Sequence, residues 1–354
     1  MLVKLYKKLL IALILIVSLG IGLTIWFFLT APLIATDKSS IHLIFPRGAS
    51  VRKMAYLLQE KNLIERPNLF ITLVSLSGID RKLQAGEYLI EPGTTLYTLI
   101  TKMIRGDTIR HAFTIIEGWN FQQVIAALNS NQHLKHTITK LKNEEIMENI
   151  GYPNEIPEGR FAPDTYLFSG EITDISILRK SYKLMQVRLD SAWKRRDKNT
   201  SYHCPYEALI VASLIEKETA LTKEKPIIAG IILRRLEQGM LLQLCPSVIY
   251  GLKHKFTGKL TKTDLLRNTL YNTYIHKGLP PSPIAMPSKE SIEAALHPIF
   301  TKALYYVSKG DGSHEFSVSL EDHNLAINKY LRTNSNLSCK TRDNKIKSQE
   351  QQLP

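Results

Sequence analysis

The segment YEALIVASLIEKETA, residues 206–220, carries apolar side chains on nearly every side as far as Ile215. A surface helix shows a single apolar stripe, whereas a helix that is apolar all round is buried. The segment therefore predicts a buried helix. It also runs directly into two acids, Glu216 and Glu218.

Residues two apart in a helix point in very different directions, so Glu216 and Glu218 cannot face each other as a pair of carboxylates. Both continue apolar stripes, so periodicity does not choose between them, and a solvated helix end is the alternative for either. A carboxylate in the last helical turn meets the negative end of the helix dipole, and apolar neighbours disfavour its charge, so its pKa should rise. An acid that stays protonated near neutral pH can serve as a general acid at a glycosidic oxygen.

The segments after this helix predict a helix, a long loop and a hairpin. EKPIIAGIILRRLEQ, residues 224–238, is an amphipathic helix by its pattern, and LYNTYIHKGLPPSPIAMP, residues 270–287, is rich in Tyr, Asn, Pro and Gly. Tandem prolines favour stiff extended loops, and the aromatic and amide side chains suit sugars, although a purely structural loop is the alternative. Ala303–Ser308 and His314–Ser319 predict two strands joined by a turn at residues 310–312.

Three segments in the first half repeat one pattern: IFPRGASVRKMAYLL at 44–58, LIEPGTTLYTLITKM at 89–103 and TIIEGWNFQQVIAAL at 114–128. Each has an apolar residue three before a glycine and a helix N-cap residue two after it, namely Ser50, Thr95 and Asn120. Apolar residues then recur at helical spacing. The unit is therefore strand, glycine turn and capped helix, and residues 40–130 are expected to form one compact α+β region. It resembles the LysM pattern of cell-wall-binding domains, and a plain packing module is the alternative.

The net charge of +14 suggests an anionic neighbour. No zinc-finger spacing or single-strand-binding signature is present, so nucleic acid is not the expected partner. Residues 9–36 contain no charged side chain and exceed the about 20 residues that a spanning helix needs. Lys4, Lys7 and Lys8 precede them, which places the N-terminus in the cytoplasm. An uncleaved membrane anchor is favoured over a signal peptide, whose apolar core would be shorter.

The cysteines and histidines give no sign of a metal site. Cys204, Cys245 and Cys339 have no short metal spacing, and the sequence leaves open whether Cys204 and Cys245 pair. Four histidines likewise lack ligand spacing: His254, His276, His297 and His323. Residues 336–354 have few apolar side chains and no periodicity, so a disordered tail is expected.

Several motifs, in this order and spacing, resemble those of the endolytic murein transglycosylase (YceG-like) family. They are EGRFAPDTYLF at 158–168, EKET, QxxPxVIYG, YNTY, GLPPxPIAxP, HP, and GxHxFS followed by HN. The resemblance covers about residues 1–335. It implies a membrane-anchored enzyme that cleaves the β-1,4 bond after N-acetylmuramic acid in peptidoglycan strands, leaves a 1,6-anhydro end and terminates strand elongation. It implies no cofactor and no metal.

The resemblance also carries site residues onto this chain. Glu218, the second acid of EKET, matches the catalytic glutamate, which donates a proton and then acts as base while the C6 hydroxyl of the substrate attacks. Ordinary glycosidases use two carboxylates. The matching substrate-binding positions are Gln243, Asn272, Tyr274, His314, Glu158, Asp164 and Tyr166. Asp164 could instead cap a turn, and His314 could be structural.

Two positions depart from the family pattern. Leu244 and Cys245 stand where the family commonly has Thr-Asp, so a second carboxylate role is in doubt. Arg160 stands where an aromatic is common, and it is a candidate contact for an acidic peptide or another chain.

The expected fold class is α+β, with an N-terminal transmembrane helix, a LysM-like α+β subdomain and a mixed α/β catalytic domain. The expected boundaries are residues 1–8 in the cytoplasm, 9–36 in the membrane, 37–130 binding glycan, 131–335 catalytic and 336–354 disordered. The catalytic part then lies outside the cytoplasmic membrane, as a single-pass periplasmic domain. Expected partners are peptidoglycan strands and, from the resemblance, wall synthases. The alternatives are a noncatalytic wall-binding scaffold for synthases and a hydrolase that uses water.

Overall fold

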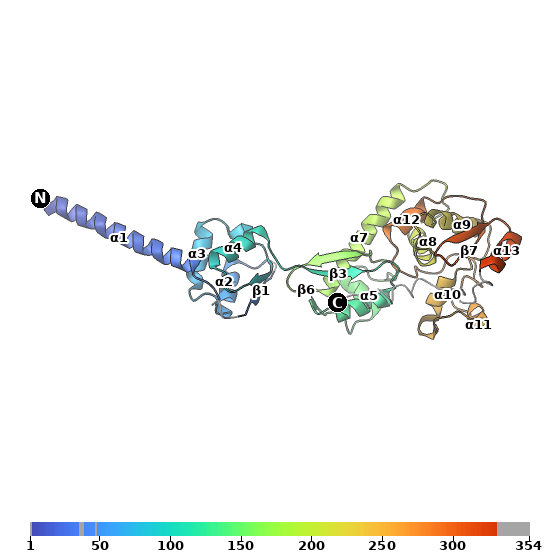
Figure 1. The fold of residues 1–354 in the computed structure, drawn as a ribbon, viewed down its shortest axis with the longest axis horizontal. Helices are drawn as coiled ribbons and strands as arrows, with labels where there is room; N and C mark the ends of the chain where they lie inside the picture. Colours follow the sequence, from blue (N-terminus) through green and yellow to red (C-terminus); the bar gives the residue numbers. More distant parts are fainter. Residues whose placement is uncertain (1, 35–38, 47, 331–354) are drawn as a thin grey trace. The chain divides into compact units, whose positions relative to one another are not determined.

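The computed structural model describes residues 2–34, 39–46 and 48–330, which divide into two compact units. Unit 1 comprises the described residues up to 112 together with 167–172, and unit 2 comprises 113–166 together with 173–330. Both contain helices and short strands, so the α+β class is confirmed (Figure 1). The expected tail at 336–354 and Cys339 lie outside the described residues.

The first helix, α1 (Leu2–Thr30), begins unit 1. Its segment from Tyr6 to Thr30 has a mean hydropathy of 2.7 and is long and apolar enough to cross a membrane. The helix ends two residues before Pro32, because proline disfavours the helical conformation of the residue before it. The expected span of residues 9–36 is therefore helical only as far as Thr30, and its last two residues lie outside the described part.

All three copies of the repeat form a strand, a turn and a helix, as predicted. Gly48, Gly93 and Gly118 have φ of 75°, 82° and 78°, the left-handed region that favours glycine. In each copy the predicted N-cap side chain accepts a hydrogen bond from a backbone N–H in the first helical turn. The three pairs are β1 (Ile41–Phe45) with α2 (Val51–Glu60), β2 (Gly86–Ile90) with α4 (Leu96–Arg105), and β3 (His111–Ile115) with α5 (Phe121–Ser130).

The first two copies form unit 1. β1 pairs antiparallel with β2, from Ile41 opposite Ile90 to Phe45 opposite Gly86. Helix α3 (Pro67–Leu76) and the short 3-10 helix η1 (Asp80–Lys82) lie between the copies in sequence. The apolar faces of both copies share one core with α3. Its members include Phe45, Leu58, Phe70, Tyr88 and Leu99.

The third copy lies in unit 2, which differs from the expectation of one compact region over residues 40–130. Strand β3 pairs with β5 (Asp164–Phe168) and not with β1 or β2, and Thr114 and Thr165 join them through a hydroxyl contact of 3.0 Å. The repeat fixes local structure, whereas the partner of each strand depends on segments distant in sequence. Whether residues 37–130 act together as a glycan-binding subdomain stays a prediction.

Unit 2 is mostly helical. After α5 come α6 (Asn143–Ile150), α7 (Asp174–Lys194) and α8 (Pro205–Glu218), which carries the two predicted acids. After α8 come α9 (Lys225–Glu237), α10 (Cys245–Leu252), the 3-10 helix η2 (Lys253–Lys255), α11 (Lys262–Leu265), α12 (Lys289–Leu296) and α13 (Leu320–Tyr330). Two-residue strands β4 (Leu134–Lys135) and β6 (Ile172–Thr173) complete the chain's short strands, apart from one hairpin.

The buried helix predicted from YEALIVASLIEKETA is α8, which is buried continuously from Ala208 to Glu216. It packs against α7, α9, α10 and α12. The predicted hairpin is also confirmed: β7 (Tyr305–Ser308) and β8 (His314–Ser317) pair antiparallel. Residues 270–287 form neither helix nor strand, as their prolines predict.

Candidate active site

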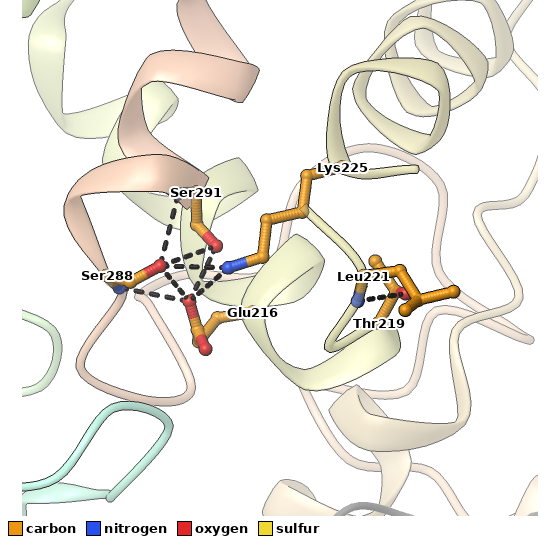
Figure 2. A network of polar contacts seen from close by, with 6 residues as sticks. All are labelled: Glu216, Thr219, Leu221, Lys225, Ser288 and Ser291. Atoms are coloured by element: carbon orange, nitrogen blue, oxygen red, sulfur yellow. Dashed lines mark hydrogen bonds and ion pairs between the residues drawn. The ribbon is translucent and has the colours of Figure 1, made fainter. Parts of the chain in front are cut away.

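The two acids at the end of α8 have opposite surroundings. Glu216 is fully buried, and its Oε2 accepts hydrogen bonds from the Ser288 N–H (3.0 Å) and the Ser291 hydroxyl (2.6 Å) (Figure 2). The Ser288 hydroxyl also donates to it, and the Lys225 Nζ lies 3.1 Å away. Burial opposes ionisation, but the Lys225 charge and the serine hydrogen bonds outweigh it and lower the pKa of Glu216. Glu216 is therefore a structural carboxylate that ties α8 to α9 and α12.

Glu218 is the last residue of α8 and has no such partners. It is partly exposed as a residue, but its Oε1 atom is buried and has no hydrogen-bond partner within the described part of the chain. Burial raises the pKa of Glu218 to about 7, and the neighbouring Tyr306 hydroxyl offsets this only in part. The expected direction of the shift is confirmed, with desolvation as its main cause. A carboxyl group in this state can release a proton near neutral pH.

Two tyrosines stand beside Glu218. Tyr306 comes from β7, and its hydroxyl is buried without a hydrogen-bond partner in the described residues. Tyr274 comes from the loop after α11. Burial and then the charge of Glu218 raise the pKa of Tyr274 to about 12 and that of Tyr306 well above its usual value. Both phenols therefore stay protonated at neutral pH and can donate to an oxygen that binds beside Glu218.

A second buried glutamate holds the hairpin against the end of α8. Glu224 accepts from the His314 backbone N–H (3.0 Å), and its Oε2 lies 2.8 Å from His314 Nδ1. The hydroxyl of Thr219, which follows Glu218, also donates to Glu224 (3.2 Å). The His314 ring then meets Tyr306 edge-on, with 5.4 Å between ring centroids. His314 thus contributes to the position of Tyr306 next to the acid.

Gln243 and Asn272 reach the same region in different ways. Gln243 is exposed, and its Oε1 accepts from the buried Arg235 guanidinium of α9 (3.3 Å). Asn272 is fully buried, and its amide nitrogen donates to the carbonyls of Leu265 (3.0 Å) and Arg267 (2.8 Å). Its Oδ1 accepts from the Tyr274 N–H (2.9 Å), so Asn272 supports the loop that carries Tyr274. Direct contact of Asn272 with a sugar stays a prediction.

Glu158 is buried, and its described hydrogen bonds go to residues other than Glu218, Tyr274 and Tyr306. Its Oε1 accepts from the Phe121 N–H (3.0 Å), and its Oε2 accepts from the Tyr250 hydroxyl (2.9 Å). Burial raises the pKa of Glu158 to about 7 although these donors stabilise its charge. Both oxygens are engaged, so the contacts of Glu158 join the start of α5 to α10.

Asp164 and Tyr166 make their described side-chain contacts with α7, with the start of β5 and with the turn just before it. Asp164 is exposed, contacts Arg188 at 2.5 Å and accepts from the Thr165 N–H, which is the turn-capping alternative noted above. The Tyr166 hydroxyl donates to the Ala162 carbonyl at 2.6 Å. Neither side chain hydrogen-bonds to Glu218, Tyr274 or Tyr306. Their part in substrate binding stays a prediction.

The structure also shows the surroundings of the three residues that depart from the family pattern, Leu244, Cys245 and Arg160. Leu244 is buried, and the Cys245 Sγ lies 3.2 Å from the Tyr274 hydroxyl. Cys204 is exposed and free, so it does not pair with Cys245. Arg160 forms an ion pair with Glu155 (3.3 Å) and stacks over the Tyr206 ring, which accounts for its charge inside unit 2.

Sequence reasoning missed three members of the site: Tyr306, Glu224 and Arg235. Arg235 carried a usable signal, because it continues the apolar stripe of Ile228, Ile231 and Ile232 on α9, and a lone arginine in such a stripe must find buried acceptors. Within residues 2–34, 39–46 and 48–330 no group of three His, Cys, Asp or Glu is arranged to hold a metal ion.

A family model described as the YceG-like family matches residues 43–329. The chain belongs to this family. A protein from Bacillus subtilis named endolytic murein transglycosylase is 31% identical over 324 residues, which cover 86% of this chain and 88% of the relative. A protein of the same name from Streptococcus pneumoniae is 24% identical, and this chain spans 61% of its length.

A solved structure supports the assignment. The crystal structure of a putative YceG-like protein from Listeria monocytogenes matches with a TM-score of 0.51 and 27% identity, and it covers 82% of this chain and 100% of that chain. The matched residues 43–329 include parts of both units and all the site residues above.

Proposed function

We propose that this protein is a membrane-anchored lytic transglycosylase that cleaves the β-1,4 bond after N-acetylmuramic acid in peptidoglycan strands. The observation that carries the proposal is the state of Glu218: a carboxyl group with a buried, unpartnered oxygen and a pKa raised to about 7. The names of the Bacillus and Streptococcus relatives support the substrate class.

In the proposed mechanism Glu218 acts twice. Its proton passes to the glycosidic oxygen as the bond from that oxygen to C1 breaks, and the carboxylate then accepts the proton of the C6 hydroxyl. The C6 oxygen bonds to C1, which gives the 1,6-anhydro end and restores the protonated acid. No water and no second carboxylate take part.

The surroundings of Glu218 fit a single-acid mechanism. Glu216 is held by Lys225 and two serines, and Glu224 is held by His314 and Thr219. Neither is therefore available as a nucleophile or base, as the second carboxylate of an ordinary glycosidase would be. Tyr306 and Tyr274 are the neighbouring donors that can bind the leaving oxygen or a sugar hydroxyl.

The remaining parts of the proposal concern location. The lysines before the apolar segment support an N-terminus in the cytoplasm, with both units outside it, where peptidoglycan is assembled. Residues 37–130 are proposed to hold glycan and residues 131–335 to cleave it. Wall synthases are the proposed protein partners, on the family resemblance alone.

The test is digestion of purified sacculi with the detergent-solubilised protein, followed by mass spectrometry of the released fragments. Products with 1,6-anhydro ends are expected, and Glu218→Gln should slow their release by about 10²–10⁴-fold, the usual contribution of a general acid. Glu216→Asp serves as the control for a neighbouring carboxylate. Reducing ends would indicate a hydrolase instead, and binding without any product would indicate the scaffold.

A further inference from the structure

Arg235 is a buried cation without an acidic partner in the described residues. It is 7% exposed, and its Nε donates to the Leu304 carbonyl (2.7 Å). Its Nη1 donates to the carbonyls of Leu241 (3.0 Å) and Leu242 (2.9 Å). A buried charge is tolerated only when such acceptors replace water. Arg235 therefore joins α9 to the turn before α10 and to the start of β7.

The same guanidinium determines which way the Gln243 amide points. The Arg235 Nη1 lies 3.3 Å from Gln243 Oε1, and a guanidinium group has donors only. The amide oxygen must therefore face Arg235, and the NH₂ group must face away. The two ends of an amide are usually assigned from their hydrogen bonds, and here the chemistry of arginine settles the assignment.

The backbone of Gln243 is held as firmly as its side chain. Its φ is +54°, which is uncommon for a residue other than glycine. Its N–H donates to the Thr273 carbonyl (3.0 Å), next to Tyr274 in the sequence.

The free end of this amide belongs to the site around Glu218. Gln243 is exposed, and its Nε2 donates to no group among the described residues. Arg235, which orients it, acts electrostatically on Tyr274 and Tyr306, and both of these interact with Glu218. Because the Gln243 backbone bonds to the Thr273 carbonyl, next to Tyr274 in the sequence, the NH₂ group is presented near the loop that carries Tyr274, with two protons available for a ligand.

We propose that Gln243 selects N-acetylated sugars by donating from Nε2 to the carbonyl oxygen of a 2-acetamido group, and that Arg235 is the positioning residue that fixes this donor outward. This inference rests on the proposed function. A sugar hydroxyl can both donate and accept a hydrogen bond, so it can bind to a protein donor or to a protein acceptor and makes no specific demand on Gln243. The acetamido carbonyl can only accept. A de-N-acetylated sugar presents an ammonium group, which can only donate and would face the amide protons.

The experiment compares peptidoglycan strands with the same strands after chemical de-N-acetylation, using kcat/KM for the release of anhydro-ended products. The wild-type protein should favour the acetylated strands by about tenfold, the effect of one hydrogen bond of ordinary strength. Gln243→Glu keeps the acceptor toward Arg235 but replaces the donor with a carboxylate oxygen. For this variant, the ratio of kcat/KM on acetylated strands to kcat/KM on de-N-acetylated strands should fall below one.

Gln243→Met, which has similar size but no donor, should bring the ratio close to one, mainly through KM on acetylated strands. Arg235→Lys should weaken the discrimination, because a single ammonium group cannot make all the hydrogen bonds by which the guanidinium holds Gln243 and its neighbouring carbonyls. Unchanged wild-type ratios in both Gln243 variants would overturn the inference. Absence of anhydro products from either strand with the wild-type protein would instead overturn the proposed function.

Discussion

Glu216 and Glu218 show how two identical side chains in one helix acquire different chemistry. Glu216 is buried where α12 supplies two serines and α9 supplies Lys225, so its charge is compensated. Glu218 lies at the helix end beside a phenol, and burial there favours its protonated form. The neighbours contributed by distant segments, and not the position in the helix, decide which acid can donate a proton.

The first prediction concerns the pH dependence of stability. The pKa of Glu218 is about 7 in the folded protein, above the value of 4.5 for an ordinary glutamate, so the folded state binds this proton more tightly. The contribution to stability is present below about pH 4.5 and is lost as the pH rises through 7. Glu218→Gln cannot ionise, so it should match the wild type near pH 4 and exceed it by about 1–3 kcal/mol at pH 8.

Chemical denaturation of the detergent-solubilised protein between pH 4 and 9 measures this difference. Glu158 also has a pKa of about 7, but it is present in both proteins and cancels. A stability difference that does not vary with pH would show that Glu218 titrates at an ordinary value.

The second prediction separates the structural acid from the proposed catalytic one. Glu216→Gln leaves Lys225 buried, with 5% of its side chain exposed, and removes its counter-charge. The free energy of unfolding should fall by about 3–5 kcal/mol, as when other buried ion pairs lose one partner. Denaturation at pH 7 measures the loss, and the double variant Glu216→Gln with Lys225→Met should recover much of it. Wild-type stability in the single variant would refute the role assigned to this ion pair.

The helices and strands that position these residues were largely predictable where local chemistry defines them. The caps Ser50, Thr95 and Asn120, the left-handed glycines before them and the glycine turn of the β7–β8 hairpin each need only a few neighbouring residues. The partner of β3 was not predictable. Pairing with β5 joins segments about fifty residues apart, and several other strands could have supplied the same backbone hydrogen bonds to β3.

The residues of the site also divide into those that local sequence motifs predict and those that only the folded structure brings in. Glu218, Gln243, Tyr274 and His314 were found through motifs, and the structure brings them into one region. Tyr306, Glu224 and Arg235 act through contacts between segments distant in the sequence, so they have no local signature. The two candidates at the start of β5 remain untested, since their described contacts are with α7 and the preceding turn.

The third prediction concerns the packing of α9, the helix that carries Arg235. A Cβ atom added at Gly230 would lie 2.2 Å from the Ile299 carbonyl oxygen, so the segment before β7 would have to move. Gly230→Ala should therefore destabilise the protein by about 1–3 kcal/mol, although alanine is the better helix former. Thermal unfolding measures the change. Increased stability would mean that helix propensity, and not this close approach, dominates at the position.

At the scale of the whole molecule, the question is on which side of the membrane the two units that follow the apolar helix α1 lie. The helix is long enough to span a bilayer, but a helix alone does not determine which side the units occupy. The orientation proposed above rests on Lys4, Lys7 and Lys8. A reporter of the side occupied by unit 2 is therefore the most direct test of the whole arrangement.

The fourth prediction uses Cys204, which is exposed and free, as that reporter. In a variant that keeps Cys204 and carries Cys245→Ser and Cys339→Ser, a membrane-impermeant maleimide should label the protein in intact protoplasts or spheroplasts, and adding Cys204→Ser should abolish this labelling. In the resulting cysteine-free protein, an engineered cysteine in place of Tyr6, near the N-terminal lysines, should react only after the membrane is permeabilised. Because positive residues are retained in the cytoplasm, Cys204 and the N-terminus must show opposite accessibility if unit 2 faces peptidoglycan. Labelling of Cys204 only after permeabilisation would place Glu218 on the side without its proposed substrate, and the function proposed here would then fail.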